Sequence, residues 1–195
     1  VALLLHMEGN PGQTVFIDEK NAVMTGSYVN YVSDTKVFGT SAAQLTPGGS
    51  LRAIFPQPQS FSKDFTIEFF VYFKSLGAND YLFDFSYNGF VFRHDGSSWR
   101  IYDGRDINLY ANRPALNTWH HVVVQRRSNW LQLYLNGIKV GEYDYGTATL
   151  TSSTLTIGNY GGGGAYTPNC IMDEFRITNG VARYLDNFAV PTTPF

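Results

Sequence analysis

One stretch, Asn117 to Gly137, limits the folds open to this chain more than any other feature. Its first arm contains the β-branched run Val122 to Val124, and its second arm, Leu131 to Leu135, alternates leucines with Gln or Tyr. A period of two is typical of a half-buried strand. Asn136-Gly137 tolerates the positive φ angles of a tight turn at low cost. The stretch and the following Ile138 to Tyr145 therefore predict three consecutive antiparallel strands.

Turn signals recur along the chain and favour short strands. Asx-Gly dipeptides are typical of hairpin turns, and no amphipathic helical stretch of useful length accompanies them. The five dipeptides are Asn88-Gly89, Asp95-Gly96, Asp103-Gly104, Asn136-Gly137 and Asn179-Gly180. Phe65 to Phe73 has one face that is entirely aromatic and aliphatic, as expected of a strand that faces the space between two sheets. We therefore expect an all-β, antiparallel two-sheet sandwich with this strand at its centre.

The remaining elements are expected at both ends of the chain. Apolar or alternating segments predict strands near residues 2–6, 15–17, 28–32, 42–45, 154–158 and 171–178. Pro56 and Pro58 indicate a surface connection. The run Gly161 to Gly164 predicts a mobile loop, and it lacks the Gly-Lys-Ser/Thr of a phosphate-binding loop.

Length and composition favour one domain. A chain of 195 residues suits a single all-β domain, which we place at residues 1–188, with 189–195 as a C-terminal tail or linker. Hydrophobic residues make up 44% of the chain, enough for a core. Charged residues make up only 15%, against roughly 25% in an average globular protein. Such a surface suits an outward-facing binding or fibre protein better than a cytosolic enzyme.

Charge and hydropathy exclude two classes of partner. A net charge of −2 and a single basic pair, Arg126-Arg127, supply no footprint for nucleic acid. The apolar runs fall far short of the roughly 20 residues that a membrane-spanning helix needs. No signal peptide is visible after Val1, and the sequence leaves open whether the chain is an excised piece of something longer. Cys170 is the only cysteine, and the apolar residues that follow it predict a buried structural thiol.

Several motifs carry a family resemblance. The Trp-x-His-Val arm, a short polar turn and L-x-L-Y-x-N-G lie in the central stretch, flanked by SKDFTIEFFVYF and IMDEFRITNGVARY. These motifs resemble laminin-G-like, pentraxin-like jelly rolls of the concanavalin A-like lectin/glucanase superfamily. The opening LLLHMEGN and the closing NF-x-VPTTPF are similar to the variant found in bacteriophage tail and bacterial surface proteins. The resemblance implies a jelly roll of about twelve to fourteen strands, in a superfamily that hosts many functions.

The resemblance also implies a structural calcium ion. In many such jelly rolls the ion lies where the acidic turn after the first strand meets the Asp of the last-strand motif. The matching positions here are Glu8, Asp18 and Asp173, and hard cations favour such oxygen ligands. Glu8 stands where the family more often has Asp. The alternative makes Glu8 and Asp18 solvated turn residues and Asp173 a backbone cap.

The sequence lacks the pattern of a catalytic site. Glucanases of the superfamily carry alternating acids on one strand, whereas Asp173 and Glu174 are adjacent and are expected on opposite faces. Glu68 stands alone among aromatic residues. His120 and His121 are also expected on opposite faces of their strand, so they form neither a metal motif nor an obvious catalytic pair. We therefore expect no enzyme activity.

Aromatic and polar residues near predicted turns are the remaining functional signal. Sugars stack on aromatic rings while carboxylates, amides and Arg bind their hydroxyls. The set comprises Trp99, Tyr102, Tyr110, Trp130, Tyr143, Tyr145, Tyr160 and Tyr166, beside Asp95, Asp103, Arg105, Asp106 and Asn108. Of these we expect ligand contacts from Trp130, Trp99, Tyr102, Arg105, Asp103, Tyr160 and Tyr166. Most aromatic residues must nevertheless belong to the core and rim of the sandwich.

Two functions from different classes follow. The first is non-catalytic recognition of a glycan or cell-surface polysaccharide, on the surface of a phage tail or virion or outside a cell. The second is a structural role, in which the domain contacts virion or tail subunits and binds no sugar. An endoglycosidase ranks third because the carboxylate pair is missing. Homo-oligomerisation is left open, since no coiled-coil heptads enforce it.

Overall fold

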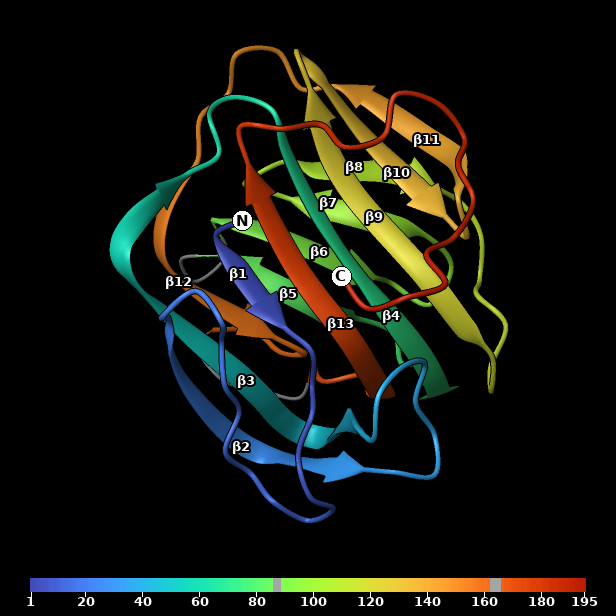
Figure 1. Ribbon diagram of the computed structural model, residues 1–195. Coiled ribbons are helices and arrows are strands. Elements are labelled where there is room, and N and C mark those ends of the chain that lie inside the picture. The colour runs from blue at the N-terminus through green and yellow to red at the C-terminus, as the bar shows by residue number, and fades with distance from the viewer. Residues whose placement is uncertain (86–88, 162–165) are drawn as a thin grey trace.

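The computed structural model describes residues 1–85, 89–161 and 166–195 of the chain (Figure 1). Thirteen strands occur in these residues, and no helix. The strands are β1 (Leu3–Leu5), β2 (Val23–Val32), β3 (Ala42–Ser60), β4 (Phe65–Ser75), β5 (Asp80–Phe85), β6 (Phe90–His94), β7 (Trp99–Tyr102), β8 (Asp106–Tyr110), β9 (Trp119–Arg127), β10 (Trp130–Leu135), β11 (Ile138–Asp144), β12 (Thr151–Ile157) and β13 (Asn169–Asn179). The described residues contain no helix that is long and apolar enough to cross a membrane.

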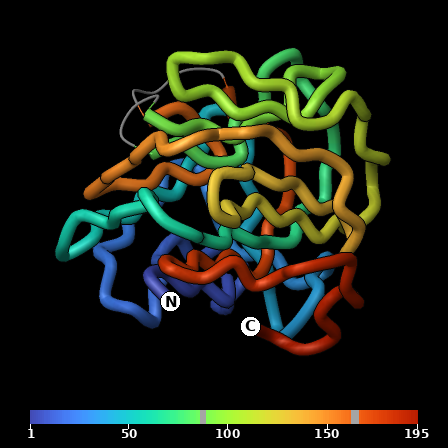
Figure 2. Tube along the Cα trace, turned by 90° about the horizontal axis from the view of Figure 1, so that it is seen from above, coloured from blue at the N-terminus to red at the C-terminus, as the bar shows by residue number. Residues whose placement is uncertain are grey.

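The strands form two facing layers that are joined through β3. The strand order is β11-β10-β9-β4-β13-β3-β12-β5-β6-β7-β8, with β1 on β13 and β2 on β3, and every pairing is antiparallel. The start of β3 pairs with β13, and its later part pairs with β12. We call β11-β10-β9-β4-β13 the first sheet and β12-β5-β6-β7-β8 the second sheet. The predicted antiparallel sandwich is confirmed (Figures 1 and 2).

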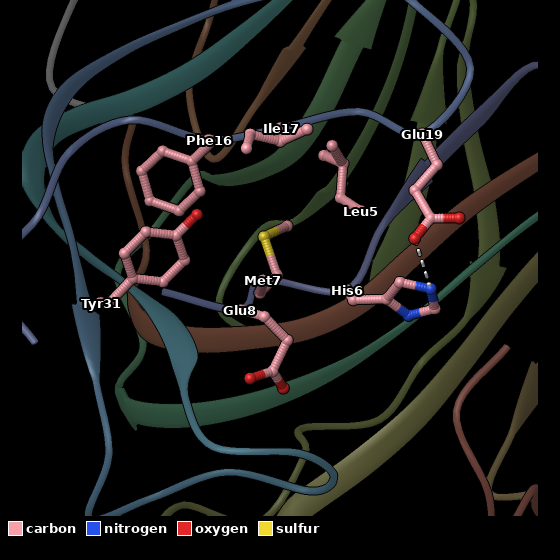
Figure 3. A pocket seen from close by; sticks show the side chains of 8 residues that line it. All are labelled: Leu5, His6, Met7, Glu8, Phe16, Ile17, Glu19 and Tyr31. Atoms are coloured by element: carbon pink, nitrogen blue, oxygen red, sulfur yellow. Dashed lines mark ion pairs between the residues drawn. The ribbon is translucent and has the colours of Figure 1, made fainter. Parts of the chain in front are cut away.

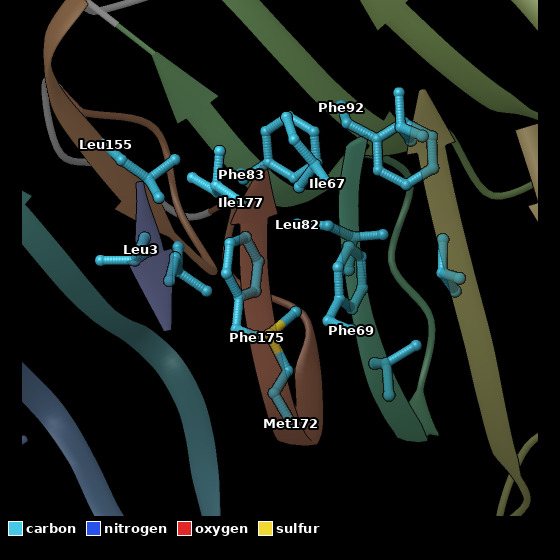
Figure 4. Packing of buried hydrophobic residues seen from close by; sticks show 14 of the residues in the cluster. Leu3, Ile67, Phe69, Leu82, Phe83, Phe92, Leu155, Met172, Phe175 and Ile177 are labelled. Atoms are coloured by element: carbon cyan, nitrogen blue, oxygen red, sulfur yellow. The ribbon is translucent and has the colours of Figure 1, made fainter. Parts of the chain in front are cut away.

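The core lies between the two sheets and is rich in phenylalanine. The ring of Phe69 on β4 stacks on Phe175 of β13, with centroids 5.2 Å apart, and meets Phe83 of β5 edge-on (Figure 4). Phe65 to Phe73 points its odd-numbered side chains into this core, as the alternation predicts. Because β4 lies between β9 and β13, its predicted central place is confirmed. Cys170 is also fully buried, and burial raises the pKa of its thiol.

The predicted turn at Asn136-Gly137 joins β10 to β11. Both residues have positive φ angles, 51° and 80°. A side chain at Gly137 would also collide with the carbonyl oxygen of Phe188. Glycine is therefore required here for two reasons, the backbone conformation and the close approach of a second segment.

Other expectations are wrong or fall outside the described residues. Residues 15–17 are not a strand. Phe16 is buried against Tyr31, but Val15 and Ile17 are exposed, and the segment pairs with no strand. Pro56 and Pro58 lie inside β3, at a register shift where neither β2 nor β12 pairs with them, so the missing N–H groups break no ladder. The turn predicted at Asn88 and the glycine run after Gly161 fall on residues 86–88 and 162–165, outside the described part of the chain.

The outer face of the first sheet is covered by residues 181–195, the C-terminal segment. In Figure 1 this segment crosses in front of the first sheet, and in Figure 2 it lies on the side away from β5 to β8. The rings of Tyr184 and Phe188 stack with centroids 3.6 Å apart. The ring of Phe195 lies 6.0 Å from Phe70, so residues 189–195 fold back onto the sheet. Their role as a linker stays a prediction.

Candidate functional site

The second sheet turns a polar face outward. Side chains alternate along each strand, so the neighbours of buried Phe92, Trp99 and Ile101 point away from the core. Strand register places Tyr81 opposite Arg93 and Arg93 opposite Arg100. A second row crosses the sheet through Thr156, Asp84, Val91, Tyr102 and Asp106. We call this outward surface of β12, β5, β6, β7 and β8 the polar face.

Three tyrosines gather at one end of the polar face. The rings of Tyr81 and Tyr166 stack with centroids 4.9 Å apart, and Tyr160 lies 6.4 Å from each of them. The backbone N–H of Tyr81 donates to the carbonyl of Tyr166, which ties the two segments together at 2.8 Å. Tyr166 is 40% exposed and Tyr160 and Tyr81 are half-buried, so the cluster presents ring surface to solvent. We call these residues the tyrosine cluster.

A polar groove of about 420 Å³ lies directly beside the tyrosine cluster. Its lining residues are Thr25, Gly26, Ser27, Gly48, Ser50, Arg52, Thr156, Asn159, Tyr160 and Gly161. Two of its lining residues are held by hydrogen bonds: Gly161 N–H donates to Asp84 Oδ2 at 2.8 Å, and Gly48 N–H donates to Thr167 Oγ1 at 3.1 Å. The groove therefore combines an aromatic wall, Tyr160, with a floor of hydroxyl and amide groups.

Arginines and aspartates form a ladder of ion pairs across β6, β7 and β8. Asp106 Oδ1 accepts from Arg93 Nη2 at 3.0 Å and from Arg100 Nε at 2.9 Å. Arg100 Nη1 also donates to Asp95 Oδ2 at 3.1 Å. Burial alone would raise the pKa of Asp95, but hydrogen bonds from Ser97 and Ser98 and the charge of Arg100 lower it to about 2. The hydrogen bond from Arg100 likewise lowers the pKa of Asp106, so both carboxylates are ionised at neutral pH.

Comparison with known families agrees with this architecture. Residues 47–183 match the family model of the concanavalin A-like lectin/glucanases superfamily. The chain belongs to this superfamily. The resemblance inferred from the sequence motifs is confirmed, and so is the jelly-roll sandwich that it implies. No curated protein sequence matches the chain as a relative.

Solved structures of similar fold include several that hold sugars. The receptor-binding domain of botulinum neurotoxin type G has a TM-score of 0.64 at 16% identity, over 90% of this chain and 46% of that one. Domain 4 of an extracellular arabinanase from Geobacillus stearothermophilus, in complex with arabinotriose, has a TM-score of 0.64 at 14% identity, over 84% and 86%. Trypanosoma rangeli sialidase in complex with sialic acid has a TM-score of 0.65 at 17% identity, over 90% and 30%. The chain thus spans about half of the neurotoxin domain. At these identities the likeness shows the fold.

The concanavalin A-like fold brings together only some of the sequence-predicted ligand residues. Tyr160 and Tyr166 meet in the tyrosine cluster, and Tyr102 lies on the same polar face, close enough to influence the pKa of Tyr81. Asp103 and Arg105 lie instead at the turn from β7 to β8. There the Arg105 guanidinium pairs with Asp103 and lies over the ring of Tyr145, 4.9 Å from its centroid. These two residues hold the turn and do not extend the tyrosine cluster.

The two predicted tryptophans lie elsewhere. Trp99 is fully buried and stacks on Phe92 with centroids 5.6 Å apart, so the prediction that it contacts ligand is wrong. Trp130 is 45% exposed, beside a shallow pocket that Arg127, Ser128, Gln132 and Glu142 complete. It belongs to β10 of the first sheet and alternates with core leucines, so it faces away from the polar face. The predicted aromatic residues therefore do not converge on one platform.

Sequence reasoning missed Tyr81, the residue that holds the tyrosine cluster together. Simple alternation would place Tyr81 on the same side of β5 as the core residues Phe83 and Phe85. A bulge between Tyr81 and Phe83 turns its side chain outward instead. Arg52, Thr156 and Asn159 were missed because their strands or turns approach the groove only through the fold. Nothing in the local sequence marks these positions.

The three carboxylates predicted to bind calcium do not fit such a site. Asp18 uses both oxygens on the backbone amides of Leu4 and Ala22, at 2.8 and 2.7 Å. Glu8 accepts from the amide of Thr40 at 2.9 Å, and Asp173 from those of Val37 and Phe38. Within the described ranges, no group of three or more His, Cys, Asp or Glu side chains could hold a metal ion. The alternative of turn and cap residues matches these contacts better.

Asp173 and Glu174 do not point to opposite faces, and that expectation is wrong. Glu174 has a φ of 52° at a bulge in the pairing of β13 with β4. The bulge inserts a residue and breaks the alternation, so both side chains lie on the outer side, where Asp173 meets Phe38 N–H and Glu174 meets Phe195 N–H. Glu68 is not alone there, because Arg176 and Tyr184 donate to it at 2.8 and 2.6 Å.

These buried carboxylates are inaccessible to a substrate. Asp173, Glu174 and Glu68 are at most 1% exposed. Each already accepts hydrogen bonds from the protein, two of them from the C-terminal segment. Glycoside hydrolysis needs two carboxyl groups that flank a bound sugar. This side of the molecule therefore presents no such pair.

A second cavity, of about 290 Å³, lies between the N-terminal residues and β2 (Figure 3). Its lining is mostly apolar, and Phe16 and Tyr31 form one wall with ring centroids 4.5 Å apart. Its polar side chains are already engaged: His6 contacts Glu174 and Glu19, and Glu8 contacts Thr40. A sugar would find few hydroxyl partners here, so the groove beside the tyrosine cluster is the better candidate.

Proposed function

We propose that this concanavalin A-like domain is a non-catalytic carbohydrate-recognition module that binds glycan at the tyrosine cluster and the adjacent groove. The observation that carries the proposal is the stacked pair Tyr81–Tyr166 with Tyr160 beside a groove lined by Thr156 and Asn159. The apolar face of a sugar ring stacks on exposed aromatic rings, while hydroxyl and amide groups bind its hydroxyls. Both kinds of surface meet here within one site.

The structural neighbours support this proposal by analogy of fold. Their structures include an arabinanase domain with arabinotriose and a sialidase with sialic acid. Fold likeness alone does not transfer a ligand, so the weight rests on the tyrosine cluster. The inaccessibility of Glu68, Asp173 and Glu174 supports binding without catalysis.

The test is a glycan-array screen of the domain, followed by titration of the best glycan with variants. We expect Tyr166→Ala and Tyr160→Ala each to weaken binding about tenfold, since stacking and burial together account for at least about 1.4 kcal/mol. Trp130→Ala is the matched control, because Trp130 is similarly exposed but lies on the other sheet. Circular dichroism and the melting temperature of each variant verify that the fold is intact.

Two outcomes would contradict the proposal. Binding that Trp130→Ala abolishes and the tyrosine variants leave unchanged would move the site to the first sheet. Absence of binding to any glycan on the array would leave the structural role as the better account. The measurement therefore decides both whether the domain binds sugar and where.

A structural role through protein contacts is the second candidate, and one observation favours it. Exposed apolar side chains gather on β2 and the loop before it, where Val15, Ile17 and Val23 are 73%, 75% and 61% exposed. Such patches are typical of protein interfaces. If they bind neighbouring subunits, Ile17→Ser with Val23→Ser will reduce self-association in sedimentation velocity and leave glycan binding unchanged. The virion or phage-tail setting rests on the motif resemblance and stays part of this proposal.

A further inference from the structure

The charges on the polar face point to the class of glycan that it binds. We infer that the site takes neutral glycans and discriminates against sialylated or uronate-containing ones, because Arg93 and Arg100 are already paired with aspartates of the same face. This inference rests on the proposed function and deepens it. The arginines are decisive, because recognition of an acidic sugar favours a guanidinium that is free to bind a carboxylate.

Arg93 and Arg100, which are paired across β6 and β7, both have carboxylate partners. Arg93 is opposite Tyr81 in the strand register, so it lies beside the tyrosine cluster. Its Nη2 donates to Asp106, and its Nη1 donates to Asn79. Arg100 is held by Asp106 and Asp95. Arg93 Nε is itself buried, so a ligand carboxylate would have to compete with Asp106 and Asp95 for these guanidinium groups.

The rest of the site does not supply an excess of positive charge. Arg52 lines the groove, but it is not an unpartnered cation. Asp84 lies in the same cross-strand row, directly opposite Thr156, and its carboxylate binds Gly161 N–H at the edge of the groove. Among the described residues, the polar face with its groove thus contains three arginines and three aspartates, Asp84, Asp95 and Asp106, so these side chains supply no net positive charge to attract an acidic sugar.

The uncharged groups match a neutral sugar well. Thr25, Ser27, Ser50, Thr156 and Asn159 line the groove with groups that both donate and accept hydrogen bonds. Sugar hydroxyls also donate and accept, so each can find a complementary partner without any change of charge. Affinity for such a ligand depends little on ionic strength, whereas binding of an acidic ligand to exposed arginines weakens as salt screens the charges.

The experiment is a glycan array that carries each neutral oligosaccharide beside its sialylated or uronate form, read at low and at physiological salt. The wild-type domain is expected to bind the neutral member of each recognised pair more strongly, with little change between the two salts. Asp106→Asn removes the shared partner of Arg93 and Arg100. This variant is expected to gain roughly tenfold or more for the acidic members at low salt, the range of a charge-assisted hydrogen bond. Asp34→Asn is the matched control, because it removes the same charge from an exposed loop.

Each outcome separates this inference from the proposed function. Wild-type preference for acidic glycans that falls with salt, together with sensitivity to Tyr166→Ala, would overturn the neutral-glycan inference and keep the glycan site. An Asp106→Asn variant that binds acidic glycans no better than Asp34→Asn does would also overturn it. Absence of binding to both members of every pair would instead contradict the proposed function itself.

Discussion

At the scale of single residues, Asp173 is a carboxyl group enclosed by the protein. It is fully buried; its Oδ2 accepts hydrogen bonds from the amides of Val37 and Phe38, and its Oδ1 has no hydrogen-bond partner among the described residues. Burial outweighs these bonds and raises the pKa of Asp173 to about 7. An unfolded aspartate has a pKa of about 3.9, so between about pH 4 and 7 the folded state holds a proton that the unfolded state has lost. Stability from this group is therefore greatest below about pH 4 and falls as the pH rises to about 7.

Asp173→Asn removes the cost of burying this charge and should stabilise the protein at alkaline pH. The amide oxygen of the substituted side chain would still accept from the two backbone amides, although its new N–H groups add some desolvation. We expect the free energy of unfolding to exceed that of the wild type by about 1–2 kcal/mol at about pH 8, and the difference to vanish near about pH 4. Urea denaturation at both pH values measures it, with Asp34→Asn as the control. A variant that is less stable than the wild type at the higher pH would show that the carboxylate is needed in its charged form.

Single residues also show where sequence reasoning reaches its limit. The buried thiol of Cys170 and the inward and outward histidines of β9 follow from composition and alternation, and the structure confirms them. Trp99 and Tyr81 do not follow. Both are aromatic residues near strand ends, and only tertiary packing decides that Trp99 enters the core while Tyr81 faces solvent. The sequence therefore predicts that aromatic residues contact the ligand more reliably than it predicts which aromatic residues do so.

At the scale of elements, strands in which apolar and polar side chains alternate without interruption could be predicted from the sequence, and β-bulges could not. β4 and the strands β9 to β11 keep a regular period along most of their length, and their pairing agrees with the sequence. β5 and β13 each contain a bulge that redirects a chemically important side chain, Tyr81 in one and Glu174 in the other. A bulge adds one residue without an obvious sequence signal. Within the candidate site, Tyr81 was missed because of such a bulge, whereas Arg52, Thr156 and Asn159 were missed because only the fold brings them to the groove.

The C-terminal segment is an element without regular structure that stabilises the first sheet. Phe188 stacks on Tyr184, approaches Tyr134 at 5.6 Å and meets His121 edge-on at 5.7 Å, and its N–H donates to Gly137 O. Phe188→Ala should therefore lower the free energy of unfolding by about 2 kcal/mol, below the value for a fully buried phenylalanine because this side chain is half-buried. Equilibrium unfolding in urea measures the change.

A neighbour in the same segment provides the control. Leu185 is 59% exposed, so Leu185→Ala should change the free energy of unfolding by less than about 0.5 kcal/mol. Equal effects of the two substitutions would contradict the view that the segment binds through its aromatic residues. Glycan binding should remain unchanged in both variants, because the segment covers the sheet opposite the tyrosine cluster.

At the scale of the whole molecule, the sandwich separates two surfaces. The outer side of the first sheet is closed by the C-terminal segment over the buried carboxylate of Glu68 and its partly buried partner Arg176. The outer side of the second sheet is open and carries the tyrosine cluster and its groove. This division could not be read from the sequence, because both sheets alternate in the same way. It places the two exposed predicted sites, Trp130 and Tyr166, on different sides of the domain.

The positions of Glu8, Asp18 and Asp173 in the whole molecule decide what calcium should do to its stability. The resemblance implied an ion held by Glu8, Asp18 and Asp173, yet each of these carboxylates is bonded to a different backbone segment. A cation gains binding energy only where several oxygens converge, and a ligand that binds the folded state raises its melting temperature. We therefore expect equal melting temperatures in millimolar calcium and in EDTA, and equal glycan binding in both. A higher melting temperature in calcium that Asp173→Asn abolishes would contradict this reading and return the ion to the last strand. An unchanged temperature would mean that backbone amides hold these carboxylates in place without a metal.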